Sequence, residues 1–236
     1  IKLTPNYGDA FITRGLAKEY LKDYNGAILD YTKSIEINPN DADSYYYRGN
    51  AKFELKDYNA AIADYTEAIK LIPNYGDAFI TRGIAKFELK DYNGAILDYT
   101  KAIEINPNYG GAFINRGLAK EYLKDYNGAI LDYTKSIEIN PNDADSYYYR
   151  GNAKSVEKDY NGAILDYTQA IEINPNYAKA YFNRGIAKFE LKDYYAAIAD
   201  YTQAIEINPN YAKAYYNKAI AKFELKDYNG ACIDAK

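Results

Sequence analysis

The stretch GDAFITRGIAKFELKDYNGAILDYTKAIEINPNY, residues 76–109, contains the pattern that decides the fold. Apolar or small residues recur in it at three-and-four spacing, which is typical of amphipathic helices. They are Ala78, Phe79, Ile80, Gly83, Ile84 and Phe87, then Ala95, Ile96, Tyr99, Ala102 and Ile103. Asp91 is suited to cap a second helix at its N-terminus, and Pro107 ends that helix because proline cannot continue the hydrogen-bond ladder. We therefore expect one helix over about 76–89 and another over about 93–105.

The same pattern repeats along the whole chain of 236 residues. Every interval between successive prolines is 34 residues; they are Pro5, Pro39, Pro73, Pro107, Pro141, Pro175 and Pro209. A constant period without insertions predicts one helix pair per repeat, stacked on its neighbours as a solenoid. Residues 1–236 are thus expected to form a single solenoid. Its complete repeats are 8–41, 42–75, 76–109, 110–143, 144–177 and 178–211, with parts of repeats at 1–7 and 212–236. The chain contains no Met, which suggests a fragment of a longer protein.

Charge and hydropathy exclude several classes of function. The net charge is −4, whereas affinity for nucleic acids and anionic membranes comes mainly from clustered Lys and Arg. No apolar run approaches the ~20 residues that span a bilayer, and the first residues, IKLTPN, do not form a signal peptide. We expect no nucleic-acid or membrane partner, and a cytoplasmic location is favoured.

Catalysis is not expected either. The chain has no His, so it has no imidazole for a triad, a proton shuttle or a metal site. Its carboxylates follow the repeat pattern and form no pair outside it, so we predict no enzyme, cofactor or metal site. Cys232 stands where other repeats have Ile28, Ile62 and Ile96, and it is therefore expected to be a small buried apolar residue.

Several positions carry the same type of residue in almost every repeat. The first helix has an aromatic residue followed four positions later by Gly, and the second helix has Ala followed four positions later by Tyr. Examples are Phe79 with Gly83 and Ala95 with Tyr99, and Ala219 replaces the Gly in the last repeat. With Pro at a period of 34, this pattern resembles the tetratricopeptide repeat. The RNA-reading pentatricopeptide family favours about 35 residues, and the acidic charge also speaks against it.

The resemblance implies an all-α fold, a right-handed superhelical α-solenoid of antiparallel helix pairs. It also implies a non-catalytic protein–protein interaction scaffold that binds a peptide or protein segment in a concave groove lined by the first helix of each repeat. Such a solenoid keeps its framework constant and varies its ligand face. Variable positions on the first helices are our candidate groove contacts: Tyr46, Tyr47, Asn50, Phe53, Ile80, Ile84, Phe87, Ile114, Leu118, Tyr148, Tyr149, Asn152, Lys179, Phe182, Asn183, Ile186, Phe189, Lys213, Tyr216 and Asn217.

The chain departs from the family pattern by placing Arg and Lys, four positions apart, on every first helix, as at Arg82 and Lys86; Lys218 replaces the Arg in the last repeat. Every second helix carries an equally regular Asp, as at Asp98. Antiparallel helices bring the two positions together, so we predict Arg–Asp pairs, within a repeat or between neighbouring repeats, in place of a free basic ribbon.

The sequence leaves the kind of ligand and the number of sites open. Its rim is acidic early and basic at Lys179 and Lys213, so the ligand is expected to be acidic toward that end. Asn152, Asn183 and Lys213 match three positions of the five-residue carboxylate clamp of some tetratricopeptide domains, and a peptide site of other specificity is favoured over it. Residues 6–52 recur at 108–154 with two differences, so a site could occur twice.

An alternative function does not use the groove. In it, the chain is a structural spacer that self-associates head to tail through uncapped ends.

Overall fold

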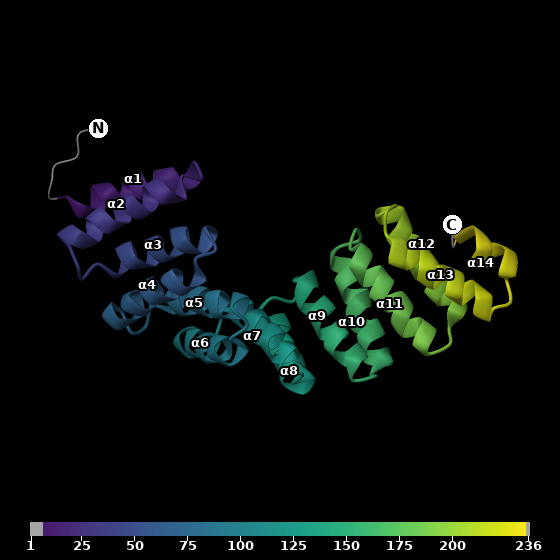
Figure 1. The fold of residues 1–236 in the computed structure, drawn as a ribbon. Coiled ribbons are helices and arrows are strands. Elements are labelled where there is room, and N and C mark those ends of the chain that lie inside the picture. The colour runs from purple at the N-terminus through teal and green to yellow at the C-terminus, as the bar shows by residue number, and fades with distance from the viewer. Residues whose placement is uncertain (1–6, 235–236) are drawn as a thin grey trace. The chain divides into compact units, whose positions relative to one another are not determined.

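The computed structural model describes residues 7–234, and this part of the chain contains fourteen helices and no strand (Figure 1). The helices are α1 (Gly8–Tyr20), α2 (Tyr24–Ile37), α3 (Ala42–Glu54), α4 (Tyr58–Leu71), α5 (Gly76–Glu88), α6 (Tyr92–Ile105), α7 (Gly110–Tyr122), α8 (Tyr126–Ile139), α9 (Ala144–Val156), α10 (Tyr160–Ile173), α11 (Ala178–Glu190), α12 (Tyr194–Ile207), α13 (Ala212–Glu224) and α14 (Tyr228–Asp234). Observed helix boundaries agree with the prediction within one residue in the repeat 76–109. The predicted partial repeat 1–7 lies almost entirely outside the described residues.

The chain forms two compact units, Ile1–Leu123 and Lys124–Lys236, which we call the N-terminal and C-terminal units. Helices α1 to α7 belong to the first and α8 to α14 to the second. Within each unit every helix contacts the next one along the chain, so each unit is a stack of helix pairs (Figure 1). Turns of three residues join the two helices of a pair, which requires an antiparallel arrangement. The predicted all-α solenoid of helix pairs is confirmed.

Capping groups and proline define the second helix of each pair. The Asp91 side chain accepts a hydrogen bond from the backbone N–H of Gly94 at 3.0 Å, as predicted for an N-cap. Helix α6 then ends at Ile105, two residues before Pro107. Asp residues cap the other second helices from α2 to α12 in the same way.

The core of each pair depends on a close contact between Gly and Tyr. Tyr99 of α6 is 1% exposed, and a Cβ atom placed on Gly83 of α5 would lie 2.6 Å from its ring. No real Cβ atom tolerates that distance, so only glycine lets the two helices approach this closely. Equivalent contacts join Gly15 with Tyr31, Gly49 with Tyr65, Gly151 with Tyr167 and Gly185 with Tyr201.

Ion pairs link the two helices of a pair beside this core. Arg48 of α3 donates to both carboxylate oxygens of Asp64 at 2.9 and 2.7 Å, and the Lys52 ammonium lies 2.6 Å from the same carboxylate. Asp64 is 4% exposed, so the two cations compensate a buried negative charge. The predicted Arg–Asp pairs are thereby confirmed, and they recur at Arg14–Asp30, Arg82–Asp98, Arg150–Asp166 and Arg184–Asp200.

Five of the six arginines, from Arg48 to Arg184, also bond to a threonine of the preceding repeat. The third guanidinium nitrogen of Arg48 donates to the Thr32 hydroxyl of α2 at 3.2 Å, and the guanidinium lies 5.5 Å from the ring centre of Tyr45. Equivalent Arg–Thr bonds join Arg82 to Thr66, Arg116 to Thr100, Arg150 to Thr134 and Arg184 to Thr168. The arginines therefore hold successive repeats together and are not available as a basic ligand surface.

Candidate functional site

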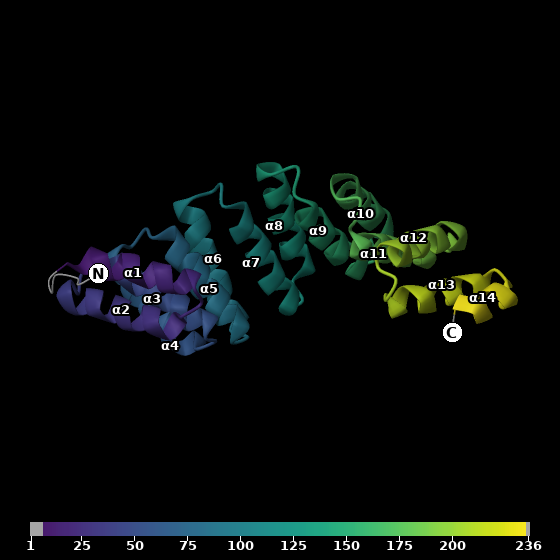
Figure 2. The ribbon, with the colours of Figure 1, turned by 90° about the horizontal axis from the view of Figure 1, so that it is seen from above.

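The first helices of neighbouring pairs form the inner face of each stack. Helix α1 contacts α3, α3 contacts α5 and α5 contacts α7 in the N-terminal unit, as do α9 with α11 and α11 with α13 in the C-terminal unit (Figure 2). Neighbouring second helices have no contact of similar extent in the described residues. Each stack is thus more closely packed along its first helices, and we call the face that they line the groove.

A hollow of about 330 Å³ opens on the groove of the N-terminal unit, and we call it the N-terminal hollow. It brings together four residues expected from the sequence: Tyr46, Asn50, Phe53 and Ile84. Four further lining residues were not among the candidate contacts: Glu19, Glu54, Tyr65 and Thr81. One signal in the sequence could have indicated Glu54. The duplicated block ends at Lys52, so Phe53 and Glu54 are the first residues beyond it and differ from Ser155 and Val156.

Hydrogen bonds and ring contacts hold the wall of this hollow in place. The buried Tyr65 hydroxyl donates to Asn50 Oδ1 at 2.9 Å, which leaves the amide N–H groups of Asn50 for other partners. Ring centres of Tyr46 lie 6.0 Å from Tyr65 and 5.1 Å from Tyr75. The Tyr75 hydroxyl is in turn fixed by a 2.7 Å bond to Asp43. The hollow is therefore largely preformed.

The C-terminal unit has two smaller hollows in its groove. One, of about 260 Å³, is lined by Asn152, Ser155, Val156, Tyr167, Asn183 and Ile186. The other, of about 180 Å³, is lined by Ile186, Phe189, Glu190, Tyr201, Asn217 and Ile220. In the first hollow, Asn183 Nδ2 donates to Asn152 Oδ1 at 2.8 Å and to the Tyr148 hydroxyl at 3.2 Å. Two residues of the predicted partial carboxylate clamp, Asn152 and Asn183, are thus bonded to each other.

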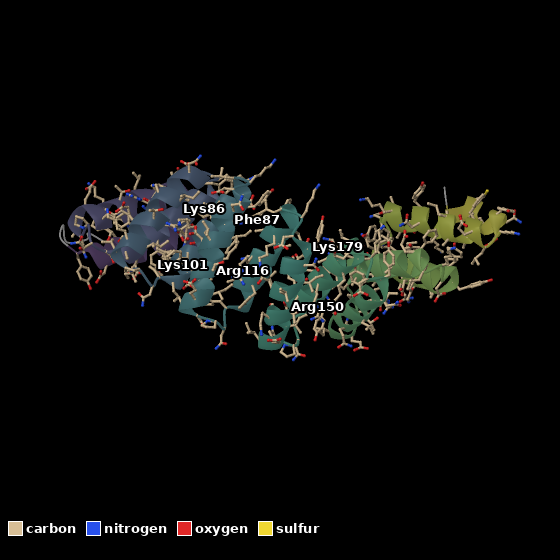
Figure 3. The ribbon with its side chains drawn as sticks, turned by 90° about the horizontal axis from the view of Figure 1, so that it is seen from below. Lys86, Phe87, Lys101, Arg116, Arg150 and Lys179 are labelled. Atoms are coloured by element: carbon tan, nitrogen blue, oxygen red, sulfur yellow. The ribbon has the colours of Figure 1, made fainter. Side chains whose placement is uncertain are left out.

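Several other predicted contacts lie in packed positions. Tyr47 stacks on Tyr31 of the preceding pair with ring centres 5.9 Å apart, and Tyr149 stacks on Tyr133 at 5.8 Å. Phe182 is only 7% exposed, because it packs between Tyr201 and Tyr211. Four further predicted contacts are partly buried: Ile80, Phe87 (labelled in Figure 3), Ile114 and Leu118.

The predicted contacts near the C-terminal end of the groove are open. Lys179, labelled in Figure 3, and Lys213 are exposed, and neither forms an ion pair within the described residues. Tyr216 is 65% exposed. This part of the groove therefore offers cations and an aromatic ring to solvent.

The N-terminal hollow is lined by two carboxylates, those of Glu19 and Glu54. Burial raises the pKa of Glu19, the nearby Tyr31 hydroxyl opposes this shift, and the Glu54 charge adds to it. Neither Glu19 nor Glu54 forms an ion pair within the described residues, and the only hydrogen bond of Glu54 comes from the Tyr24 hydroxyl at 3.4 Å. The buried atoms Glu19 Oε1 and Tyr31 Oη have no hydrogen-bond partner there.

The expectation that Cys232 is buried is wrong. Cys232 is exposed on α14, a helix with no buried residue. The equivalent Ile28, Ile62 and Ile96 are partly covered because each of those helices packs against a following first helix, and none follows α14 in the described residues.

Comparisons with known proteins identify the repeats. Family models described as tetratricopeptide repeat match residues 42–75, 76–109, 111–143 and 178–211, and a second such model matches 132–164 and 200–233. A model described as TPR repeat matches 20–56 and 157–192. A comparison with curated proteins gave no match.

Solved structures share the fold. A tetratricopeptide repeat protein from Parabacteroides merdae is 19% identical, with a TM-score of 0.75, over 96% of this chain and 90% of that chain. YrrB, described as a TPR protein with an unusual peptide-binding site, is 22% identical with a TM-score of 0.67, over 84% and 97%. MamA is 26% identical with a TM-score of 0.63, over 65% and 90%. No described helix is both long and apolar enough to cross a membrane.

Proposed function

The chain belongs to the tetratricopeptide repeat family, and we propose that it is a non-catalytic scaffold that binds a peptide or protein segment along the groove. The observation that carries this proposal is the recurrence of hollows on the first-helix face of both units, each with an asparagine side chain in its wall. Concave sites with apolar walls and a few fixed polar groups are typical of ligand-binding surfaces.

The polar groups of the hollows suit a polypeptide backbone. An extended peptide presents N–H and C=O groups at regular intervals, and a side-chain amide can donate to one and accept from the other. Asn50 and Asn152 are each oriented by a tyrosine hydroxyl at 2.9 Å, so little side-chain entropy is lost when they bind. The peptide-binding site described for YrrB supports the same class of ligand.

Charge gives the ligand a direction along the chain. Asp43 and Asp77 lie in the first turns of α3 and α5, whereas the equivalent positions of α11 and α13 carry the exposed Lys179 and Lys213. A ligand segment that contacts the C-terminal unit is therefore expected to be acidic near these lysines. The partial clamp of Asn152, Asn183 and Lys213 belongs to the same proposal.

A display experiment with matched variants tests groove binding. Random peptides are selected on the full chain, and their Kd is then measured by fluorescence anisotropy for the wild type, Phe53→Ser and Leu97→Ala. Ser155 stands 102 residues later, at the position equivalent to Phe53, so the fold accommodates the first change. Leu97 is 68% exposed on a second helix, away from the groove.

Groove binding predicts a Kd about fivefold or more higher for Phe53→Ser on peptides that occupy the N-terminal hollow, and no change for Leu97→Ala. The reverse pattern, with Leu97→Ala weakening the selected peptides and Phe53→Ser leaving them unchanged, would place binding on the outer face and refute the proposal.

A second candidate function is that of a self-associating spacer. It is favoured by the exposed apolar side chains at the last helix pair: Phe223 is 58% exposed and Ile233 is 71% exposed. Sedimentation velocity over a range of concentrations tests this alternative. A sedimentation coefficient that does not change with concentration would exclude it.

A further inference from the structure

The N-terminal hollow contains two carboxylates that the rest of the fold leaves uncompensated. Buried Asp64 has both Arg48 and Lys52 as partners, and Glu67 has Lys70 on its own helix. Glu19 and Glu54 both line the hollow and have no such cation in the described residues. The charge of Glu54 adds to the rise that burial causes in the pKa of Glu19.

Two buried polar atoms near these carboxylates also lack a partner. Glu19 Oε1 has almost no contact with solvent and accepts no hydrogen bond in the described residues. The hydroxyl of Tyr31, a residue that is 0% exposed, also makes no hydrogen bond there; it lies beside the Glu19 carboxylate and opposes the rise in the pKa of Glu19. Leaving a buried polar atom unsatisfied costs about 1–3 kcal/mol. A donor from a ligand that entered the hollow would recover that cost at Glu19.

The walls of the hollow suit a cation of a particular shape. Tyr46, Phe53 and Tyr65 provide aromatic surface on the same cavity as the two carboxylates. A guanidinium group is planar, stacks on aromatic rings and can donate to two carboxylates at once, whereas an ammonium group is a compact and strongly hydrated charge.

The equivalent positions 102 residues later, the offset of the duplicated block, support a selective role for Phe53 and Glu54. Tyr46, Asn50 and Tyr65 have identical counterparts in Tyr148, Asn152 and Tyr167. Phe53 and Glu54, in contrast, are replaced by Ser155 and Val156, and Thr81 is replaced by Asn183. The hollow of the C-terminal unit has Val156 in the place of Glu54, and the Asn183–Asn152 hydrogen bond fills its centre. The two hollows therefore differ at the position of Glu54.

We propose that the N-terminal hollow is a subsite for a basic side chain of the bound peptide, arginine in preference to lysine, held by Glu19 and Glu54. This inference rests on the proposed function and specifies its ligand: a segment with an arginine at the N-terminal hollow and acidic residues toward Lys179 and Lys213.

The test uses the full chain and three blocked pentapeptides, with arginine, lysine or glutamine between pairs of alanines. Each is titrated into isotopically labelled protein and followed by NMR. The variants are Glu19→Gln with Glu54→Gln, and the matched control Glu88→Gln, which lies at the position of α5 equivalent to Glu54 but does not line the hollow. Circular dichroism of each variant verifies its fold.

We expect the arginine peptide to shift the signals of Asn50 and Ile84 and to bind about tenfold more tightly than the glutamine peptide, with lysine between them. The double variant should remove this preference, and Glu88→Gln should retain it. Equal Kd values for the arginine and glutamine peptides, or an undiminished preference in the double variant, would overturn the inference. If these equal Kd values accompany shifts in the groove, the proposed groove function still stands. The proposed function fails too if two results occur together. No peptide shifts an NMR signal of a first helix, and every peptide selected by display binds the wild type and Phe53→Ser with the same Kd.

Discussion

Gly83 shows that the packing of a helix pair depends on a position that carries no side chain. A Cβ atom at Gly83 would lie 2.6 Å from the Tyr99 ring, whereas at Gly111, near the start of α7, it would meet nothing within 4 Å. We expect Gly83→Ala to lower the free energy of unfolding by about 1–3 kcal/mol, because the two helices must separate. Gly111→Ala should raise it by about 0.5–1 kcal/mol, because alanine loses less backbone entropy in a helix. Urea titration of both variants measures the difference, and equal effects would contradict it.

Glu19 gives a prediction with a defined pH dependence. Because burial raises its pKa in the folded state, the folded chain pays an energetic cost to ionise Glu19 at neutral pH, with Tyr31 and Glu54 as the neighbouring titratable groups. Below the pKa of about 4.3 in the unfolded chain, Glu19 is protonated in both states and the cost disappears. Glu19→Gln should therefore raise the melting temperature at pH 7 and have no effect near pH 3. Destabilisation at every pH would show that the carboxylate is a structural group.

The recurrent residues could be predicted from the sequence, whereas residues that occur once could not. Arg82 and Asp98 have equivalents in other repeats, and a cation that always accompanies an anion implies a pair. Glu54 differs from Val156 just beyond the duplicated block, but no residue of its repeat reveals that this Glu lines a hollow shared with Glu19. Phe182 illustrates the opposite error, because a variable position on a first helix can also be filled by a buried ring.

At the scale of elements, the turns within the helix pairs depend on a lysine in an unusual conformation. Lys90 has φ = 63°, and the backbone N–H groups of Lys90 and Asp91 bond to the carbonyls of Phe87 and Lys86. This is the Schellman arrangement, whose left-handed residue is usually glycine. The sequence predicted the Asp cap and the proline stop, but it could not predict this φ, because lysine is not a signal for it.

The lysine turn therefore contains strain that glycine would relieve. We expect Lys90→Gly to raise the free energy of unfolding by about 1 kcal/mol, because a side chain at positive φ is sterically disfavoured. Lys101→Gly, inside α6, serves as the control and should lower it by about 1 kcal/mol or more, since the helix loses propensity and the 2.6 Å pair with Glu104. Thermal unfolding followed by circular dichroism compares the two, and a lower melting temperature for Lys90→Gly would show that the lysine makes a contact that offsets its strain.

At the scale of the molecule, the period of 34 residues predicted the stacking of helix pairs because each pair can cover its apolar face only with the next. The period carries no information on the division of the chain into compact units, which falls after Leu123, between the two helices of one repeat. The exposure of Cys232 was missed for a related reason: a position within a repeat is buried only where a neighbouring repeat covers it.

Stability in such an array should spread only to near neighbours. Asp64→Asn leaves Arg48 and Lys52 without their shared carboxylate, at a cost of about 3 kcal/mol because both cations are partly buried. The Arg48–Thr32 bond transmits the effect to the preceding pair, so we expect faster amide hydrogen exchange in α2 to α5 and unchanged exchange in α10 to α13. Glu67→Gln in the same helix removes only an exposed pair with Lys70 and should change exchange little. Hydrogen exchange measured by mass spectrometry distinguishes a local loss of protection in α2 to α5 from an even loss over the described residues. An even loss would contradict the prediction, because it would mean that residues 7–234 open as a single cooperative domain.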